Sequence, residues 1–179
     1  MHHIHFSMAV DQNSAHRLID TLHATTMTQD LDVTLYINSP GGNVVAGIHA
    51  YNMISAMPLN LTTHNVGNVD SIANVIFLAG AKRAASPYST FMFHSVGFDQ
   101  SGPIRLEERN LRQFLDSVVA DNKRMGGIIA SRTDLTERSA GALFREQKTR
   151  ESAWALKNGF VHDVRDPSIA PGTNVVKIA

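Results

Sequence analysis

Two short stretches of the sequence hold residues suited to nucleophilic chemistry. GNVDSIANVIFLAG places Ser71 after a strand and a glycine-containing turn, at the start of an apolar helix, and STFMFH ends a strand in His94. A serine becomes a nucleophile when a base such as histidine lies near it. Taken alone, each residue also has a plain structural explanation, the serine as a helix N-cap and the histidine as a buried core residue. Together they make an acyl-transfer site a hypothesis worth testing.

A third stretch, YINSPGGNVV, would supply the complementary part of such a site. It ends a strand-like run in Gly41 and Gly42, just before a helical pattern begins. Backbone N–H groups beside a helix start can bind an anion or a developing oxyanion. Glycine is needed there if the backbone takes a positive φ or if a substrate passes close to it. The alternative is a tight turn with no role in chemistry.

Alternating strands and helices are predicted to position these residues. The pattern predicts strands at 3–9, 33–38, 61–66 and 89–94, and helices from Asn13 or Ser14 to about 25, at 44–57 and at 71–81. This alternation is typical of an α/β layered fold with mostly parallel strands. In open parallel sheets the functional crevice lies at the carboxyl ends of the strands, which is where His94 is expected.

A long amphipathic helix is predicted at about 104–130, after a loop-like stretch at 98–104. Its apolar residues recur at spacings of three, four and seven, and they are Leu111, Leu115, Val118, Met125 and Ile129. We expect a helix this long on a small α/β domain to project and to pack on another molecule. The alternative is that it covers its own domain.

The rest of the chain is predicted to complete a single domain over residues 1–179. Two further helices are expected at 136–147 and 150–158, the second ended by Gly159. The turn-rich tail at 165–179 is either mobile or a late edge strand. A chain of 179 residues is long enough to bury a core without disulfides or metals.

The composition excludes several classes of protein. Lys and Arg together number 16, as do Asp and Glu, so a formal net charge of zero gives no reason to expect nucleic acid or an anionic membrane as partner. Without cysteine there are no disulfides, thiolate metal sites or cysteine nucleophile, and a cytoplasmic location is expected. The sequence has no run of about 18 apolar residues, so it predicts no membrane span. We interpret His2, His3 and His5 as part of a strand rather than as metal ligands, and expect neither metal nor cofactor.

The three motifs, in this order, resemble the proteolytic subunit of the Clp protease, in the larger group that also holds the crotonases. The resemblance rests on YINSPGG, GNVDSIANVIFLAGAKR and SPYSTFMFHSVG, covers roughly residues 4–164, and includes the ending SAWALKNGFVHDV. Ser71 follows Gly42 by 29 residues, a spacing that agrees with the family. Three motifs at matching spacing are far more specific than any one alone.

The resemblance implies a ClpP/crotonase-like layered fold and a serine peptidase that acts on peptides or unfolded proteins. By this resemblance Ser71 is the nucleophile, and His94 is its general base and later the general acid. The N–H groups of Gly42 and Ile72 would form the oxyanion hole. The helix at about 104–130 would be a handle that interlocks two seven-subunit rings of a homo-oligomer, and GFDQSGP would pair with an extended peptide.

The position of the family's third catalytic residue departs from the pattern. Counting back from Gly159 puts Gln147 where aspartate is expected, with Glu146 beside it. A glutamine carbonyl can fix the tautomer of His94 but supplies no charge, and loss of the acid in such triads costs on the order of 10⁴-fold in turnover. A shift of one residue would place Glu146 there instead. The third residue is therefore Gln147, Glu146 or none.

Three further departures concern the surroundings of the site and its partners. Val69 and Asp70 precede the serine where the family usually has two alanines, and we expect the Asp70 carboxylate to face outward. The loop between Ser71 and His94 is about two residues shorter than usual. The chain also begins almost at its first strand, without the segment by which the family contacts an ATPase ring, which argues against an AAA+ unfoldase as partner.

Three functions are compatible with these observations. The leading one is a self-compartmentalising serine peptidase with a Ser–His mechanism and a backbone oxyanion hole. The alternative is a catalytically weak or inactive homologue that serves as an oligomeric scaffold or regulatory subunit, which Gln147 and Asp70 favour. The third is crotonase-type acyl-CoA chemistry, which needs no serine–histidine pair, so the presence of both residues argues against it.

Overall fold

A mostly parallel sheet forms the centre of the computed structural model, which describes residues 1–97, 102, 105 and 107–178. Among these residues its strand order is β6-β5-β3-β2-β1-β8, while β4 joins β3 to β7. The strands are β1 His2–Ser7, β2 Asp32–Ser39, β3 Asn60–Asp70, β4 Lys82–Ala85, β5 Thr90–Met92, β6 Thr149–Glu151, β7 Asp163–Val164 and β8 Val175–Ile178. Only the β5–β6 pair is antiparallel in the described part of the sheet. The predicted α/β class is confirmed.

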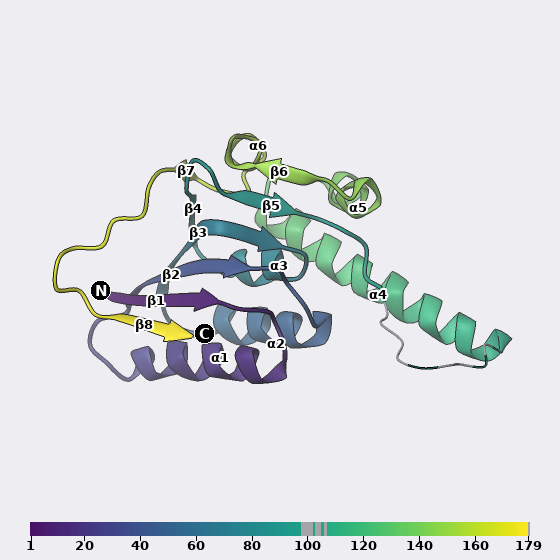
Figure 1. The fold of residues 1–179 in the computed structure, drawn as a ribbon, viewed down its shortest axis with the longest axis horizontal. Helices are drawn as coiled ribbons and strands as arrows, with labels where there is room; N and C mark the ends of the chain where they lie inside the picture. Colours follow the sequence, from purple (N-terminus) through teal and green to yellow (C-terminus); the bar gives the residue numbers. More distant parts are fainter. Residues whose placement is uncertain (98–101, 103–104, 106, 179) are drawn as a thin grey trace.

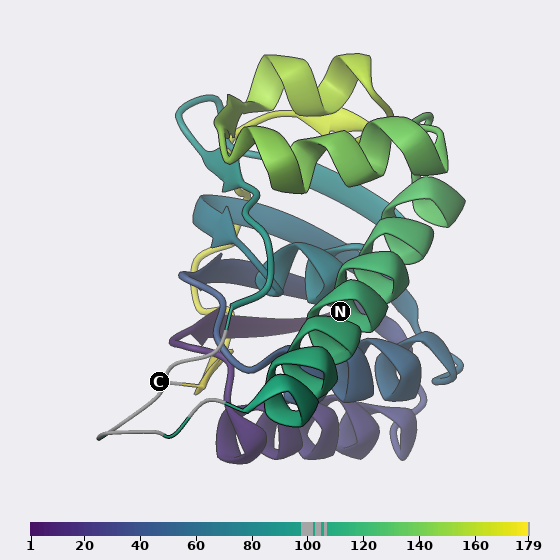
Figure 2. The same ribbon diagram turned by 90° about the vertical axis from the view of Figure 1, so that its right-hand side faces the viewer.

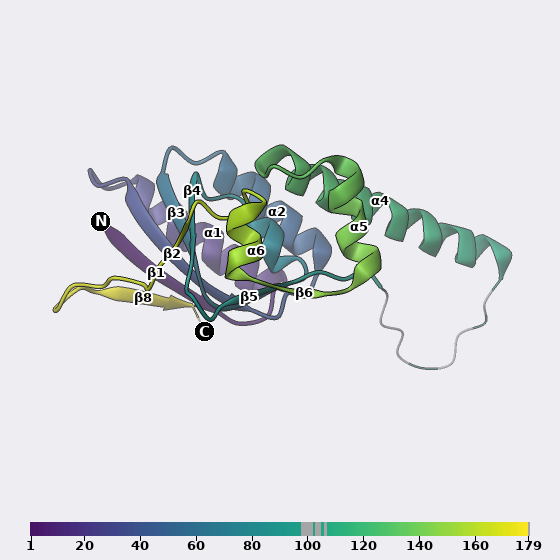
Figure 3. The same ribbon diagram turned by 90° about the horizontal axis from the view of Figure 1, so that it is seen from above.

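The helices α1 and α2 lie on one side of this sheet, and the tail after β7 lies on the other (Figure 3). The helices are α1 Gln12–Thr26, α2 Val44–Ser55, α3 Ala73–Phe77, α4 Glu108–Arg132, α5 Glu137–Glu146 and α6 Ser152–Lys157. The arrowheads of β1, β2, β3 and β5 all point toward the side from which α4 extends (Figure 1). The parallel strands therefore end together on that side.

Local sequence explains where the first helices begin and corrects one prediction. Helix α1 is capped by Asp11, not by Asn13 or Ser14, because the Asp11 side chain accepts the N–H of Ser14 while the Ser14 side chain accepts that of Asp11. This reciprocal arrangement is a capping box. Helix α2 begins after Asn43, whose side chain accepts the N–H of Ala46.

Helix α3 is shorter than the predicted 71–81 because the chain turns tightly beyond it. A Cβ added at Gly80 would lie 2.4 Å from Thr63 Oγ1, so the backbone packs directly on β3 there. The helix is buried along its whole length, and its Phe77 ring lies 5.3 Å from that of Phe91 and 6.0 Å from that of Phe160, centroid to centroid. These rings are part of the core that supports the carboxyl ends of β3 and β5.

Helix α4 divides into a packed half and an exposed half. Met125 and Ile129 are fully buried near its end, whereas Leu111, Leu115 and Val119 are 51%, 62% and 56% exposed. Figure 1 shows the first half extending past the sheet, and Figure 2 shows the helix crossing the end of the layers. The helix thus projects as predicted. None of the helices in the described part of the chain is long and apolar enough to cross a membrane.

The tail ends as an edge strand, which decides between the two predicted alternatives. Strand β8 pairs in parallel with β1, with His3 opposite Val175. On the way to β8 the tail passes the sheet, where the Tyr36 hydroxyl donates to the Ser168 carbonyl at 3.4 Å. The short strands β4, β6 and β7 were not predicted, because two to four residues give too little pattern to recognise.

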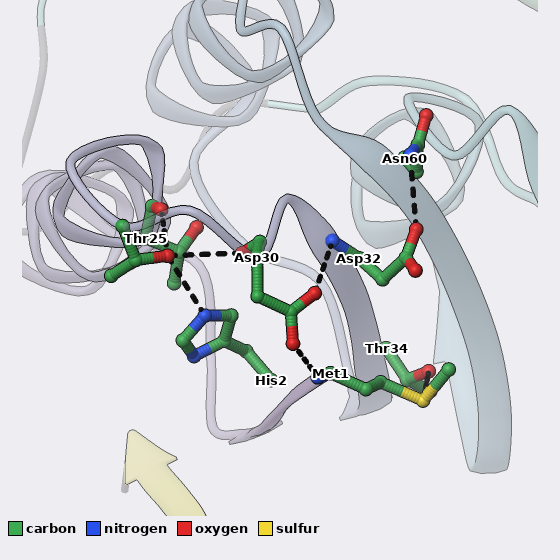
Figure 4. A network of polar contacts seen from close by, with 8 residues as sticks. Met1, His2, Thr25, Asp30, Asp32, Thr34 and Asn60 are labelled. Carbon is green, nitrogen blue, oxygen red and sulfur yellow. Dashed lines mark hydrogen bonds and ion pairs between the residues drawn. The ribbon is translucent and has the colours of Figure 1, made fainter.

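A polar network ties together the amino ends of the central strands, opposite the end at which the motifs gather (Figure 4). The Asn60 amide donates to Asp32 Oδ1 at 2.9 Å, and the Asp32 N–H donates to Asp30 Oδ1 at 3.1 Å. His2 Nε2 lies 3.1 Å from Thr28 Oγ1. These contacts fix the loops at this end without involving the three motifs.

Candidate active site

The three motifs meet in one cavity at the carboxyl ends of β2, β3 and β5. The cavity has a volume of about 340 Å³ and is lined by Pro40, Gly41, Gly42, Val44, Ser71, His94, Ser95, Val96 and Gly97. A register shift between Ile37 and Ser39 marks the end of β2 nearby. Such irregularities bend a strand and redirect the residues beyond it.

Ser71 sits in a strained turn between β3 and α3. Its φ is +54°, a left-handed value that is uncommon for a residue other than glycine. The turn is held because the Ser71 N–H donates to the Met92 carbonyl at 2.8 Å, and the Asn74 amide donates to the carbonyls of Ser71 and Met92 at 3.0 and 2.8 Å. Strain of this kind costs about 1–3 kcal/mol and is concentrated at functional sites.

The helical position predicted for Ser71 is wrong. The serine precedes α3 by two residues, and Ile72 rather than Ser71 takes the N-cap position, with no side-chain cap bond. The purely structural explanation of Ser71 as an N-cap is therefore excluded. The side chain is 8% exposed and lies on the cavity wall.

The two glycines line the same cavity, Gly41 packed against the serine turn and Gly42 against Val10. Gly41 has φ +82°, and a Cβ there would lie 2.6 Å from both the Asp70 carbonyl oxygen and Ser71 Cβ. Gly42 has φ +146°, and a Cβ there would lie 2.2 Å from the Val10 carbonyl oxygen. Only glycine fits either position, which explains the pair quoted from the sequence.

Two backbone donors near the serine are not used by the fold. The Val10 N–H donates to the Gly41 carbonyl at 2.8 Å, and the Val10 carbonyl accepts the Asn43 N–H at 2.7 Å. None of the hydrogen bonds between described residues uses the N–H of Gly42 or that of Ile72. Oxyanion holes are built from such unpaired, preorganised N–H groups.

His94 is half-buried on the cavity wall, and its tautomer is fixed by a neighbour. Its Nδ1 lies 2.8 Å from the Ser95 carbonyl oxygen, which can only accept, so Nδ1 carries the proton. Nε2 is then the atom free to act as a base. In the described residues no hydrogen bond joins Ser71 to His94, and such bonds commonly form only when substrate is bound.

The predicted candidates for a third catalytic residue have other partners, and neither is hydrogen-bonded to His94 among the described residues. Gln147 is exposed, takes a left-handed conformation with φ +50°, and caps α5 through its own N–H to the Leu143 carbonyl. Glu146 forms an ion pair with Arg150. The identity of the third residue, Gln147, Glu146 or none, therefore stays a prediction.

Asp70 does not simply face outward as expected. Its Oδ1 is buried and has no hydrogen-bond partner among the described residues. Burial raises the pKa of the Asp70 carboxyl, although the Asn68 amide, the Met92 N–H and the charge of His94 each act to lower it. The reason is that β3 continues to Asp70 itself, four residues beyond the predicted end of the strand, so this side chain stays within the sheet.

The stretch GFDQSGP, expected to pair with a peptide, lies mostly outside the described residues. Gly97, its first residue, lines the cavity. The long helix expected to follow it begins at Glu108 rather than at about 104. The role of this stretch therefore stays a prediction.

These observations define a layered α/β protein with a serine, a histidine and unpaired backbone donors around one strand-end cavity. The profile of the Clp protease family matches residues 1–168. The chain belongs to the Clp protease family, and the resemblance drawn from its motifs is confirmed.

Several Clp protease proteolytic subunits are similar to the chain. One from Oltmannsiellopsis viridis is 31% identical over 127 residues, covering 69% of this chain and 63% of that protein. Another from Bacteroides fragilis is 30% identical over 122 residues, covering 63% of this chain and 59% of that protein. Subunit 2 from Thermobifida fusca is 35% identical over 88 residues, covering 48% of this chain and 43% of that protein. The matched segments thus span 43% to 63% of the length of these relatives.

The fold is also that of a solved structure. A ClpP1 mutant from Listeria monocytogenes superposes with a TM-score of 0.80 at 20% identity, covering 92% of this chain and 91% of that one. At this identity the likeness concerns the fold. It agrees with the layered ClpP architecture and the projecting helix expected from the sequence.

Proposed function

We propose that the chain is a serine peptidase that cleaves peptide bonds by a Ser–His mechanism. The observation that carries this proposal is the meeting of Ser71, His94 and Gly42 on one cavity of about 340 Å³, with Ser71 in a strained turn. A satisfied core histidine and a capping serine have no reason to share a cavity with unpaired N–H groups. Membership of the Clp protease family supports the same reaction.

The proposed steps use only groups of this chain. Ser71 Oγ attacks the scissile carbonyl carbon and gives its proton to His94 Nε2. The N–H groups of Gly42 and Ile72 donate to the oxyanion of the tetrahedral intermediate. His94 then returns the proton to the leaving amine, and a water activated by the same histidine hydrolyses the acyl-enzyme.

We also propose that the single domain works as a homo-oligomer that encloses its sites. The exposed leucines Leu111 and Leu115 on the projecting half of α4 support this. Contiguous apolar surface on a protein in water commonly marks the place where a partner binds. A second copy of the chain is the partner implied by the family. A cytoplasmic location is part of the proposal, whereas an AAA+ unfoldase partner, not expected from the sequence, is not.

Cleavage of a mixture of short fluorogenic peptides tests the proposal. The folded wild-type protein should release fluorophore, whereas Ser71→Ala and His94→Ala should lose at least about 10³-fold in turnover. The conservative surface change Asp20→Asn on α1 serves as the matched control. If the folded, oligomeric wild type cleaves none of the peptides, the peptidase proposal fails.

The competing candidate is an oligomeric scaffold or regulatory subunit. It is favoured by one observation, that Gln147 and Glu146 leave His94 without the expected acid. A scaffold would be inactive alone and would co-purify with an active paralogue, and activity of the isolated chain would exclude it.

A further inference from the structure

The strand pairing places Asp70 on the same face of the sheet as His94. Asp70 on β3 is opposite Met92 on β5, and His94 follows Met92 by two residues. Side chains alternate along a strand, and both Val69 and Phe93 point into the core with 0% and 1% exposure. Asp70, Met92 and His94 therefore share the other face.

This placement brings the carboxylate within reach of the imidazole. Neighbouring strands lie about 4.8 Å apart and each residue rises about 3.3 Å, so the backbones of Asp70 and His94 are about 8 Å apart. Two side chains that lean toward each other across this gap can interact. The charge of His94 does act on Asp70, since it lowers the pKa of that carboxyl against the effect of burial.

The carboxylate is also available for this interaction. Its Oδ2 accepts a long 3.4 Å hydrogen bond from the Asn68 amide, while its buried Oδ1 has no partner among the described residues. A carboxylate that is partly removed from water interacts more strongly with a nearby cation than an exposed one does. A buried acceptor without a partner calls for an explanation, and a catalytic role is one.

We propose that Asp70 supplies the negative charge that stabilises the His94 imidazolium, while the Ser95 carbonyl holds the tautomer. The two tasks that one acid performs in a serine–histidine–aspartate triad are thereby divided between two groups. When Ser71 loses its proton to His94 Nε2, the imidazolium forms beside an ionised Asp70, which itself stays deprotonated. Asp70 is a positioning residue in this scheme, and the inference rests on the proposed peptidase function.

Other charged groups near His94 are carried by α4, α5 and β6. Lys123, Glu137 and Arg145 line a separate cavity that also includes Ser95. Glu146 is paired with Arg150 of β6. Both β3 and β6 pair directly with β5, the strand that leads into His94. Arg150 of β6 is ion-paired, whereas Oδ1 of Asp70 on β3 has no partner among the described residues.

The rate at which a fluorophosphonate phosphonylates Ser71, measured from about pH 5 to 9, tests this inference without knowledge of the substrate. Asp70→Asn should react about 10- to 100-fold more slowly at its maximum, as expected for loss of a charge at this range. Asp70→Glu should recover part of the rate, and Asp20→Asn should match wild type. Thermal unfolding of each variant establishes that it is folded.

The failures of the inference and of the proposed function are distinguishable. A rate in Asp70→Asn that equals or exceeds that of wild type would overturn the inference and leave the peptidase intact. A slower phosphonylation in Gln147→Asn with an unchanged rate in Asp70→Asn would also overturn it, and would assign the supporting role to Gln147. Absence of any reaction in folded wild type would instead remove the proposed function itself.

Discussion

Ser71 owes its exposure to the cavity to backbone geometry rather than to its own side chain. The left-handed turn at φ +54° directs the residue out of β3, and Gly41 packs against that turn so closely that no larger residue fits. The amide of Asn74 holds the turn by donating to the carbonyl of Ser71 and to that of Met92 on β5. The nucleophile is thus placed by residues that do no chemistry themselves.

Gly41→Ala should disable the site by displacing this turn. The new Cβ would meet the Asp70 carbonyl oxygen and Ser71 Cβ at 2.6 Å, and alanine would have to take φ +82°. We expect a loss of about 1–3 kcal/mol in stability, together with loss of fluorophosphonate labelling. Chemical denaturation and intact mass measure the two effects.

The matched control is Gly127→Ala in α4, where an added Cβ would meet nothing within 4 Å. It should be neutral or stabilising by up to about 1 kcal/mol, since alanine is the better helix former. A Gly41→Ala protein as stable and as reactive as wild type would refute the role assigned to the glycine.

Strand β3 carries a second buried group whose titration should be visible in stability. His64 is 2% exposed, its ring is tilted by 42° to that of Tyr36 with centroids 5.9 Å apart, and its Nε2 lies 3.3 Å from Ser86 Oγ. Burial and, to a lesser extent, the charge of Arg165 lower the pKa of His64, while a backbone hydrogen bond with Arg165 and the carboxylates of Asp163 and Asp166 oppose this. The neutral form is therefore the one that the fold favours.

This depressed pKa predicts a loss of stability in mild acid. As pH falls below about 6.5, His64 takes up a proton in the unfolded chain before it does so in the folded protein, so unfolding becomes easier. The part of the unfolding free energy that comes from neutral His64 is fully present above that pH. His64→Gln, which keeps a polar group for Ser86, should show a smaller fall between about pH 7 and 5. Parallel slopes of the unfolding free energy against pH for the two proteins would show that His64 is not responsible.

The exposed half of α4 matters at the scale of the whole molecule. Its apolar residues Leu111 and Leu115 lie beyond the sheet, and the chain has no net charge to keep copies apart. A face that is apolar on an otherwise polar helix is a candidate contact between copies. The packed half, with Met125 and Ile129 buried, anchors the helix to its own domain.

The double change Leu111→Glu with Leu115→Glu should convert the oligomer to smaller species. Charge placed in a desolvated contact costs far more than the same charge in water. Light scattering coupled to size exclusion measures the mass, and Gln113→Glu on the polar face is the control. A double variant with the mass of wild type would rule out this face as the contact.

The sequence allowed more of the architecture to be predicted than of the site's electrostatics. Long periodic segments such as α4 and continuous apolar strands such as β2 could be predicted, because burial sets the spacing of apolar residues along the sequence. The strand end at Asp70 was not, since Gly67 and Asn68 look like a turn although β3 continues through them. Whether a carboxylate lies inward depends on this register, which only the tertiary pairing with β5 decides.

The site itself could be named but not completed from the sequence. Gly42, Ser71 and His94 were identified by order and spacing, and they do share a cavity. The Ser95 carbonyl that holds the His94 tautomer leaves no sequence signal, because every residue has such a group. Asp70 did give a signal as an unusual residue before the serine, although it was interpreted as facing outward.

The measurement that tests the central claim most directly is the intact mass after treatment with a fluorophosphonate. It is made on wild type, Ser71→Ala and His94→Ala, each checked to be folded. The account predicts a single adduct on wild type and none on either variant, because only a serine activated by a histidine reacts readily with this reagent. Folded wild type without an adduct would contradict it, and the strained turn and glycine wall would then be architecture without chemistry.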